Sequence, residues 1–150
     1  MKHLLILISL ILLSSPLFGD NHKGEPLYLW ETSPSVRWYI FGDKFTRPQY
    51  KGEVENGKPN GLGVLIFPYN GKSIVGEWKN GKELKTEHIR KDGSVIGEFE
   101  MGENGQVTFT SPDGTKYVGE FKYDKTWKGT FYDINGNIVI GSLMENRRKQ

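Results

Sequence analysis

The chain has 150 residues, with 20 Lys and Arg, 18 Asp and Glu, and a formal net charge of +2. Because the two signs are interspersed, there is no strong positive field to attract nucleic acid, and we exclude that class of protein. The chain has no cysteine, which excludes disulfides, a thiol nucleophile, a thiolate metal site and a lipidated cysteine. The length fits one domain, and 19 glycines with 13% aromatic residues favour short strands joined by tight turns.

The first residues have the pattern of a secretory signal. A short basic start, "MKH", precedes the apolar run "LLILISLILL", and "SSPLFG" then supplies small residues and a helix breaker. The run is shorter than the ~20 apolar residues that a spanning helix needs, and no later stretch approaches that length. We therefore predict a signal peptide over residues 1–19 and a protein exported to the periplasm or secreted. A retained N-terminal helix, either buried or anchoring the protein in a membrane, is the alternative.

Residues 20–49 differ from the rest of the chain and read as an N-terminal cap. The segment "PLYLWETSPSVRWYIFGDKF" predicts two strands that flank a Ser-Pro-Ser turn. The cap would cover the exposed edge of the repeats that follow, because unprotected sheet edges pair with other chains. Its aromatic side chains are the candidates for that contact: Tyr28, Trp30, Trp38 and Phe41.

A five-residue motif recurs through the rest of the chain. It reads "YKGEV" at 50–54, "IVGEW" at 74–78, "VIGEF" at 95–99, "YVGEF" at 117–121 and "VIGSL" at 139–143. Because the motif returns at a nearly constant interval, the sequence indicates a repeat architecture. Its units are about 50–73, 74–94, 95–116, 117–138 and a partial 139–143. The central glycines of the motif are Gly52, Gly76, Gly97, Gly119 and Gly141.

Turn signals divide each unit into two strands. Asn-Gly or a looser Gly-rich turn follows the first strand, and Asn-Gly or Asp-Gly follows the second. Because these turns suit tight hairpins, the sequence predicts an all-β fold, a single-layer antiparallel meander of repeated hairpins.

Alternation along the first strands places apolar residues on one face of this meander. The predicted sets are Tyr50/Gly52/Val54, Ile74/Gly76/Trp78, Val95/Gly97/Phe99, Tyr117/Gly119/Phe121 and Val139/Gly141/Leu143. Each glycine leaves a gap that a ring from a neighbouring strand can fill. Aligned on the following turn, the second strands offer Ile66, His88, Phe109 and Phe131 for this purpose. The aromatic residues expected to hold the repeats together or to contact a partner are Tyr50, Trp78, Phe99, Phe109, Tyr117, Phe121 and Phe131.

The segment "YKGEVENGKPNGLGVLIFPYNG", with its Y-x-G-E, N-G, G-x-G and F-P elements, resembles a MORN (membrane occupation and recognition nexus) repeat. The resemblance covers residues 50–143, and later units such as "YVGEFKYDKTWKGTFYDINGN" are looser. It implies an elongated array of β-hairpins that serves as a scaffold or protein-binding module. Lipid association in some members and bacterial antitoxin-type relatives are also implied. Residues 79–93 depart from the pattern because they lack the second G-x-G, residues 122–127 lack the N-G turn, and Ser142 replaces the glutamate.

The repeated glutamates are the strongest candidates for catalysis. In a meander the equivalent strands lie two places apart, so their backbones are separated by about 9.6 Å. Inverting glycosidases separate their carboxylates by about 6.5–9.5 Å. Four equivalent copies nevertheless favour a shared structural task, such as pairing with Lys51, Lys79 or turn amides. The four residues are Glu53, Glu77, Glu98 and Glu120.

Other enzyme signatures are absent from the sequence. Histidine occurs at positions 3, 22 and 88, so a chain without its signal cannot form a three-histidine metal site. We interpret His88 as an ordinary strand residue at an aromatic position. The "GLG" at 61–63 lacks the lysine and the helix of a phosphate-binding loop. We therefore predict that the protein is not an enzyme and uses no cofactor.

The sequence favours an exported, non-catalytic scaffold that binds another protein. Two alternatives remain: peripheral binding to anionic lipid, and inhibition of a toxin as an immunity-type protein. An open sheet also permits edge-to-edge self-association. Residues 144–150 are interpreted as a frayed polar tail. The lipid hypothesis uses the lysines that flank the motifs: Lys51, Lys72, Lys79, Lys116 and Lys122.

The predicted signal can be tested directly. Cleavage after Gly19 would leave a chain of 131 residues, 20–150, that begins at Asp20. Mass spectrometry of the protein from its native cells should give this mass. A mass that still includes Met1 to Gly19 would contradict the prediction.

Overall fold

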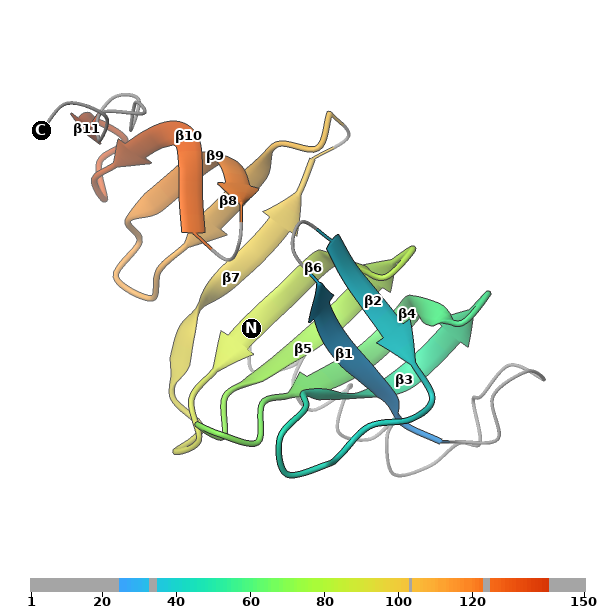
Figure 1. Cartoon of the computed structure of the whole chain (residues 1–150). Helices are drawn as coiled ribbons and strands as arrows, with labels where there is room; N and C mark the ends of the chain where they lie inside the picture. The colour runs from blue at the N-terminus through green and yellow to red at the C-terminus, as the bar shows by residue number, and fades with distance from the viewer. Residues whose placement is uncertain (1–24, 33–34, 103, 123–124, 141–150) are drawn as a thin grey trace, which may run out of the picture.

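The computed structural model describes residues 25–32, 35–102, 104–122 and 125–140 (Figure 1). Eleven strands form one antiparallel sheet in the order β11-β10-β9-β8-β7-β6-β5-β4-β3-β1-β2. The predicted meander of consecutive hairpins is therefore confirmed. The signal at 1–19, the tail at 144–150, Gly141 and Leu143 lie outside the described residues. Within the described ranges, no helix is long and apolar enough to cross a membrane.

The strands from β3 onward follow the chain order, and each pairs with the next. The first two strands form a separate hairpin, in which β1 lies between β2 and β3. The strand bounds are β1 (Leu27–Thr32), β2 (Ser35–Tyr39), β3 (Gln49–Glu55), β4 (Lys58–Ile66), β5 (Ser73–Lys79), β6 (Lys82–Ile89), β7 (Val95–Met101), β8 (Val107–Thr110), β9 (Lys116–Lys122), β10 (Lys125–Tyr132) and β11 (Ile138–Ile140).

Two of the hairpins close with Asn-Gly turns. Asn56 and Gly57 have φ angles of 51° and 71°, and Asn80 and Gly81 have 50° and 81°. Positive φ at both central residues is the type I′ geometry, whose twist matches that of the flanking strands. These turns join β3 to β4 and β5 to β6.

A second kind of turn closes other hairpins, and Arg90 to Ser94 is the example. The Arg90 amide donates to Ser94 O at 2.8 Å, and Gly93 donates to Arg90 O at 2.9 Å. Asp92 Oδ1 accepts from the Ser94 amide at 2.9 Å and from its hydroxyl at 2.7 Å. These bonds, the side-chain one foremost, lower the pKa of Asp92. The looser turn at 102–106 has this geometry and not that of the Asn-Gly turns.

The apolar residues of the repeats gather on one side of the sheet, which we call the inner face. Tyr50 is 1% exposed and Trp78 4%. Burial, together with the charge of Glu53, raises the pKa of Tyr50, so its hydroxyl stays protonated as a hydrogen-bond donor. The main core cluster consists of Leu27, Leu29, Tyr50, Leu65, Phe67, Ile74 and Trp78.

Paired glycines create the space in which the rings of the inner face lie. Gly52 pairs with Gly63 across β3 and β4, and a Cβ on Gly63 would overlap the ring of Tyr50. The Tyr50 hydroxyl donates to Glu53 O at 3.0 Å. Tyr117 lies in the same way over Gly119 and Gly129. At the first-strand glycines Gly52 and Gly119 the ring therefore comes from the same strand, whereas the sequence predicted one from a neighbouring strand.

The prediction for the second strands is right at one gap and wrong at another. Phe109, from the neighbouring strand β8, fills the gap at Gly97. Ile66, however, is 40% exposed, and Leu65 at 3% takes the inner position. The turn from Phe67 to Lys72 has one residue more than the turn from Arg90 to Ser94. An alignment on the turn glycines is therefore displaced by one residue in β4, and it selects Ile66 of the outer face in place of Leu65 of the inner face.

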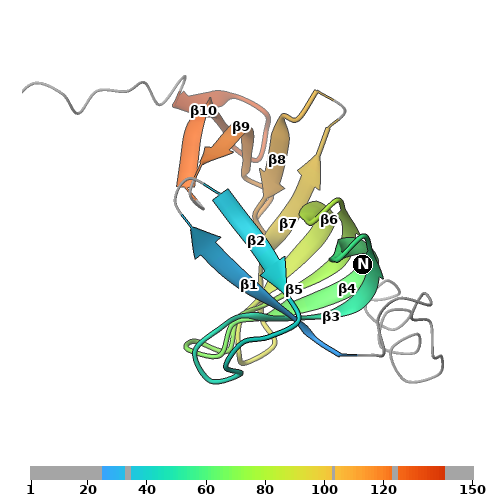
Figure 2. The ribbon, with the colours of Figure 1, turned by 45° about the vertical axis from the view of Figure 1, so that its right-hand side comes forward.

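The N-terminal hairpin is placed differently from the prediction. It pairs with the edge of β3 only at Leu27–Tyr50 and Tyr28–Gln49. The hairpin is joined to the sheet through these two pairs, but it turns out of the plane of the other strands and lies across their inner face (Figure 2). Trp38 stands edge-on to Tyr50 and Trp78, with ring centroids 5.8 Å and 6.2 Å apart.

Of the four aromatics expected to cover the edge, only Trp38 joins the main core. Alternation explains the difference, because Leu27 and Leu29 take the inward positions of β1 and leave Trp30 facing outward. Trp30 contacts Phe41 and Tyr39 on the outer side of the hairpin. Phe41 is 59% exposed.

We predict that Gly63→Ala is strongly destabilising. The new methyl group would meet the buried Tyr50 ring, and overpacking of this kind costs about 1–3 kcal/mol or more. Chemical denaturation measures the change. Gly57→Ala is the matched control, because an added Cβ there meets nothing within 4 Å and only the positive φ of 71° is strained. An equal or smaller loss at Gly63 would contradict the packing described above.

Candidate functional site

The candidate site is the set of aromatic side chains on the inner face. In its N-terminal part, the rings of Tyr50 and Trp78 lie 5.3 Å apart and are covered by the β1–β2 hairpin. The indole N–H of Trp38 donates to Gly81 O at 3.2 Å and fixes the hairpin over them. The Trp78 N–H is buried and finds no hydrogen-bond acceptor among the described residues. These two rings act in packing and are not available to a partner.

The C-terminal part of the inner face carries a second group of rings, which we call the aromatic row. Its members are in mutual contact. The distances between ring centroids are 6.0 Å for Phe99 and Phe121, 6.5 Å for Phe109 and Phe121, and 4.9 Å for Tyr117 and Phe131. Tyr117 and Phe99 are buried, whereas Phe109, Phe121 and Phe131 are half-buried. The aromatic row consists of Phe99, Phe109, Tyr117, Phe121 and Phe131.

His88 lies between the covered part of the inner face and the aromatic row. Its Nε2 is 2.6 Å from Glu83 Oε2, and the buried Thr86 donates its hydroxyl to the same oxygen at 2.6 Å. The imidazole stacks on Phe99 and meets Phe109 edge-on. His88 thus has the packing role that the sequence predicted. The sequence reasoning missed Glu83 and Thr86, because strict alternation along β6 places Glu83 on the face opposite His88. The register shift at Leu84, where Trp78 pairs with Glu83 and Glu77 with Lys85, brings Glu83 to the inner face.

The four repeat glutamates lie on the outer face but have different neighbours. Glu53 Oε1 accepts a hydrogen bond from the Leu62 amide of the neighbouring strand β4 at 3.0 Å. The other three stand opposite residues of the neighbouring strands: Glu77 opposite Lys85, Glu98 opposite Glu87 and Glu120 opposite Lys128. They do not form one repeated site.

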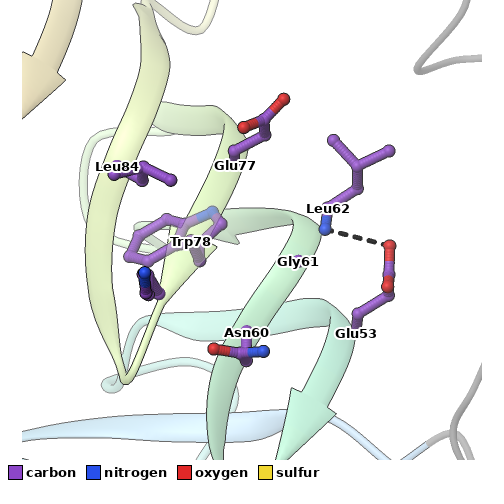
Figure 3. Close-up of a pocket in the computed structure, with 8 residues that line it drawn as sticks. Glu53, Asn60, Gly61, Leu62, Glu77, Trp78 and Leu84 are labelled. Atoms are coloured by element: carbon purple, nitrogen blue, oxygen red, sulfur yellow. Dashed lines mark hydrogen bonds between the residues drawn. The ribbon is translucent and has the colours of Figure 1, made fainter.

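An open hollow of about 320 Å³ lies near the Asn-Gly turns (Figure 3). Glu53 and Glu77 both line it, and Figure 3 shows the Leu62 side chain between them. Since an apolar side chain separates the carboxylates and one of them binds a backbone amide, the hollow does not present a pair of acids to a substrate. Its full lining is Glu53, Asn60, Gly61, Leu62, Glu77, Trp78, Lys79 and Leu84.

Glu87 is the one carboxyl of the outer face whose pKa is raised among the described residues. Partial burial is the main cause, and the charge of Glu98 directly opposite adds to it. In the part of the chain that the structure describes, no three His, Asp or Glu side chains are placed to hold a metal ion.

The lysines expected to contact lipid do not gather in one patch. Lys51 on β3 and Lys116 on β9 are separated by five strands, and Lys79 lies beside an Asn-Gly turn. Lys72 lies in the turn between β4 and β5, at the opposite end of the sheet from Lys79. Lys122 ends β9.

The comparison with protein families agrees with this geometry. Residues 50–68, 75–83 and 96–116 match the model of the MORN repeat. The three segments include the first-strand glycines Gly52, Gly76 and Gly97 and begin at or close to β3, β5 and β7. No curated protein matches the chain.

We predict that Glu87→Gln stabilises the protein at neutral pH. A raised folded-state pKa means that the ionised carboxylate is less stable in the fold than in the unfolded chain, so the wild type gains stability as the pH falls through that pKa. The substitution should raise the free energy of unfolding by a few tenths to about 1 kcal/mol at neutral pH, and this difference should vanish in acid. Thermal melts at neutral and acid pH test this.

Glu100→Gln is the control, because Glu100 stands opposite Lys85 and loses an attraction instead of a repulsion. It should leave the melting temperature unchanged or lower it slightly. Equal stabilisation by both variants would show that the Glu87–Glu98 pair has no special role.

Proposed function

Because the chain belongs to the MORN repeat family, we propose that it is a non-catalytic scaffold that binds another protein at the cell envelope. The aromatic row on β7–β10 is the contact surface. The predicted signal sequence supports the envelope location, since its pattern directs export.

The observation that carries this proposal is the difference between the two parts of the inner face. Tyr50 and Trp78 are covered by the β1–β2 hairpin, whereas Phe109, Phe121 and Phe131 continue the same face and are half-buried. Partly exposed aromatic rings on a rigid sheet are favoured anchors in protein interfaces, because they bury large area with little loss of conformational entropy.

The hairpin itself shows how the inner face accommodates another segment. Leu27, Leu29 and Trp38 supply apolar side chains, and the Trp38 indole adds one hydrogen bond to the backbone oxygen of Gly81. A partner that binds the aromatic row would use the same chemistry, with an apolar or aromatic side chain on the rings and a donor toward a turn carbonyl. This is also the mode expected if the partner is a toxin that the protein inhibits.

A structural role for the polar groups supports the absence of catalysis. His88 is engaged by Glu83 and packed between rings, and Glu53 binds a backbone amide. The four repeat glutamates have unlike partners, so no pair of acids recurs from unit to unit.

We predict that Phe131→Ala weakens partner capture while the sheet remains folded. Truncation of an interface anchor costs about 2 kcal/mol or more, which corresponds to a loss of affinity of about 30-fold. The measurement is affinity capture from the native envelope with the exported protein as bait, with thermal melting as the test of folding.

Tyr132→Ala is the matched control, because Tyr132 is the next residue of β10 and lies on the other face. It should retain capture. Equal capture by wild type and both variants would refute the assignment of the aromatic row. Parallel losses of capture and melting temperature in Phe131→Ala would assign the ring to packing alone.

A further inference from the structure

The outer side of the β1–β2 hairpin carries aromatic and basic side chains, and none of its described outward positions is acidic. Directly paired residues of antiparallel strands share a face, so Arg37 lies beside Trp30, and Tyr39 follows two residues on. The loop 40–48 adds Phe41, whose ring is 5.9 Å from that of Trp30, and Arg47, whose guanidinium lies 3.8 Å from the Trp30 centroid. We call these five residues the cap face: Trp30, Arg37, Tyr39, Phe41 and Arg47.

Both guanidinium groups of the cap face are available to an anion. Neither Arg37 nor Arg47 forms an ion pair or a side-chain hydrogen bond with another described residue. Asp43, the acid of the adjoining loop, directs its carboxylate oxygens to the Phe45 amide and the Thr46 hydroxyl. The planar fork of donors on an arginine matches the two oxygens of a carboxylate, so the cap face suits a partner that carries acidic side chains.

Hydrogen bonds hold the loop part of the cap face in place. The Arg47 amide donates to Asp43 O at 2.8 Å, and the Trp30 indole donates to Phe41 O at 3.3 Å. Groups that are fixed before binding lose less conformational entropy when a partner covers them. The rings and the Arg47 guanidinium are therefore presented in a ready-made arrangement.

The free edge of β2 lies beside the cap face. β2 is the last strand of the sheet, and β1 is its partner among the described strands. On β1, Leu29 donates its amide to Pro48 O at 3.0 Å, on the side away from β2. Because antiparallel hydrogen bonds alternate, Trp38, which pairs with Leu29, and Val36 direct their N–H and C=O groups to the free edge of β2. Such an edge is a template to which an extended segment can add as a further strand.

We infer that the free edge of β2 takes up an extended, acidic segment of a partner protein as an added strand. A residue opposite Arg37 shares its face at about 4.5–5.5 Å between Cβ atoms, so an aspartate or glutamate there pairs with the guanidinium. Two residues along the segment, an apolar side chain faces Tyr39, with Phe41 beyond it. The pattern that the edge selects is an acidic and an apolar residue two positions apart.

Exposed rings continue beyond the apolar position. Phe41 is 59% exposed, and Phe45 and Tyr69 are exposed at the same end of the sheet, where the β2–β3 loop and the β4–β5 turn lie in both ribbon views (Figures 1 and 2). A partner segment that runs past Tyr39 therefore meets further apolar surface.

The charge of Arg37 decides between this partner and a second copy of the chain. Arg37 is the central residue of the five-residue strand β2, so a two-fold antiparallel pairing of β2 with β2 places Arg37 against Arg37. Like charges directly opposite each other are destabilising, and a charge on an edge strand commonly guards against such self-pairing. The same charge attracts an acidic strand, so one residue disfavours the copy and selects the partner.

The cap face is separate from the aromatic row of the scaffold proposal. It lies outside the segments that match the repeat family, and on the opposite side of the hairpin from Trp38, which packs against the core of the inner face. A molecule with both surfaces can join two partners. Substitutions on one surface should leave binding at the other unchanged.

The test is an NMR titration of the isotope-labelled exported protein with the synthetic peptide Thr-Glu-Thr-Val-Thr, acetylated and amidated at its ends. The amide signals of Val36 and Trp38 should shift, because their N–H groups gain acceptors. A peptide with glutamine in place of glutamate should bind about fivefold more weakly, through loss of the charge pair. Methylation of the peptide nitrogens that face β2 should weaken binding about tenfold, through loss of strand hydrogen bonds.

Charge exchange provides the sharpest variant. Arg37→Glu should bind the glutamate peptide at least about tenfold more weakly and should bind a peptide with lysine in its place about as well as wild type binds the original. Lys116→Glu on β9 is the matched control, because Lys116 is exposed, the net charge changes equally and the paired Thr110 is neutral. It should bind the glutamate peptide as wild type does, and all variants should melt at similar temperatures.

Several outcomes would overturn the inference. Unshifted Val36 and Trp38 amides at millimolar peptide would do so, as would equal affinities for the glutamate, glutamine and lysine peptides or an equal loss in Lys116→Glu. Shifts of the same amides with protein concentration, without peptide, would assign the edge to a second copy of the chain. Phe131→Ala should bind the peptide as wild type does, so a failure at this edge is distinguished from a failure of the aromatic row.

Discussion

The close contact between a tyrosine ring and a pair of glycines is the constraint on which the sheet depends. Tyr50 lies over Gly52 and Gly63, and its hydroxyl binds Glu53 O, so ring, strand and register are fixed together. The same arrangement recurs at Tyr117 over Gly119, where the hydroxyl donates to Glu120 O at 2.9 Å. A single-layer sheet has no second sheet to pack against, and it therefore needs its own rings to lie flat and close.

The shortage of packing partners also explains the N-terminal hairpin. A single-layer sheet that leaves its apolar face open would expose a large continuous patch to water. The hairpin covers the part of that face around Tyr50 and Trp78 with Leu27, Leu29 and Trp38. It does not extend over the aromatic row. The division between a covered and an open part of one face is what turns a regular repeat into a molecule with a distinct binding region.

The sequence predicted the strands, the turns and the inner residues of the first strands, because these follow from local rules of alternation and turn chemistry. The prediction that Ile66 lies on the inner face was wrong. One additional residue in the turn that follows displaces the alignment, and Leu65 takes the inner position. For the repeat glutamates the sequence left open a pairing with Lys51, with Lys79 or with turn amides, and Glu53 binds the Leu62 amide of β4. The partners of Glu77, Glu98 and Glu120 depend on cross-strand register, which the motif alone does not specify.

By itself the sequence determined an antiparallel meander whose unit is a hairpin with glycine at its centre, since period-two alternation and Asn-Gly or Asp-Gly turns admit little else. Only the tertiary structure decided where the first hairpin lies, because two backbone pairs to β3 leave its direction free and the packing of Trp38 on Trp78 then sets it. Only the tertiary structure also gathered Phe41, Phe45 and Tyr69 at one end, since residues far apart in sequence become neighbours when antiparallel strands bring alternate turns to the same edge.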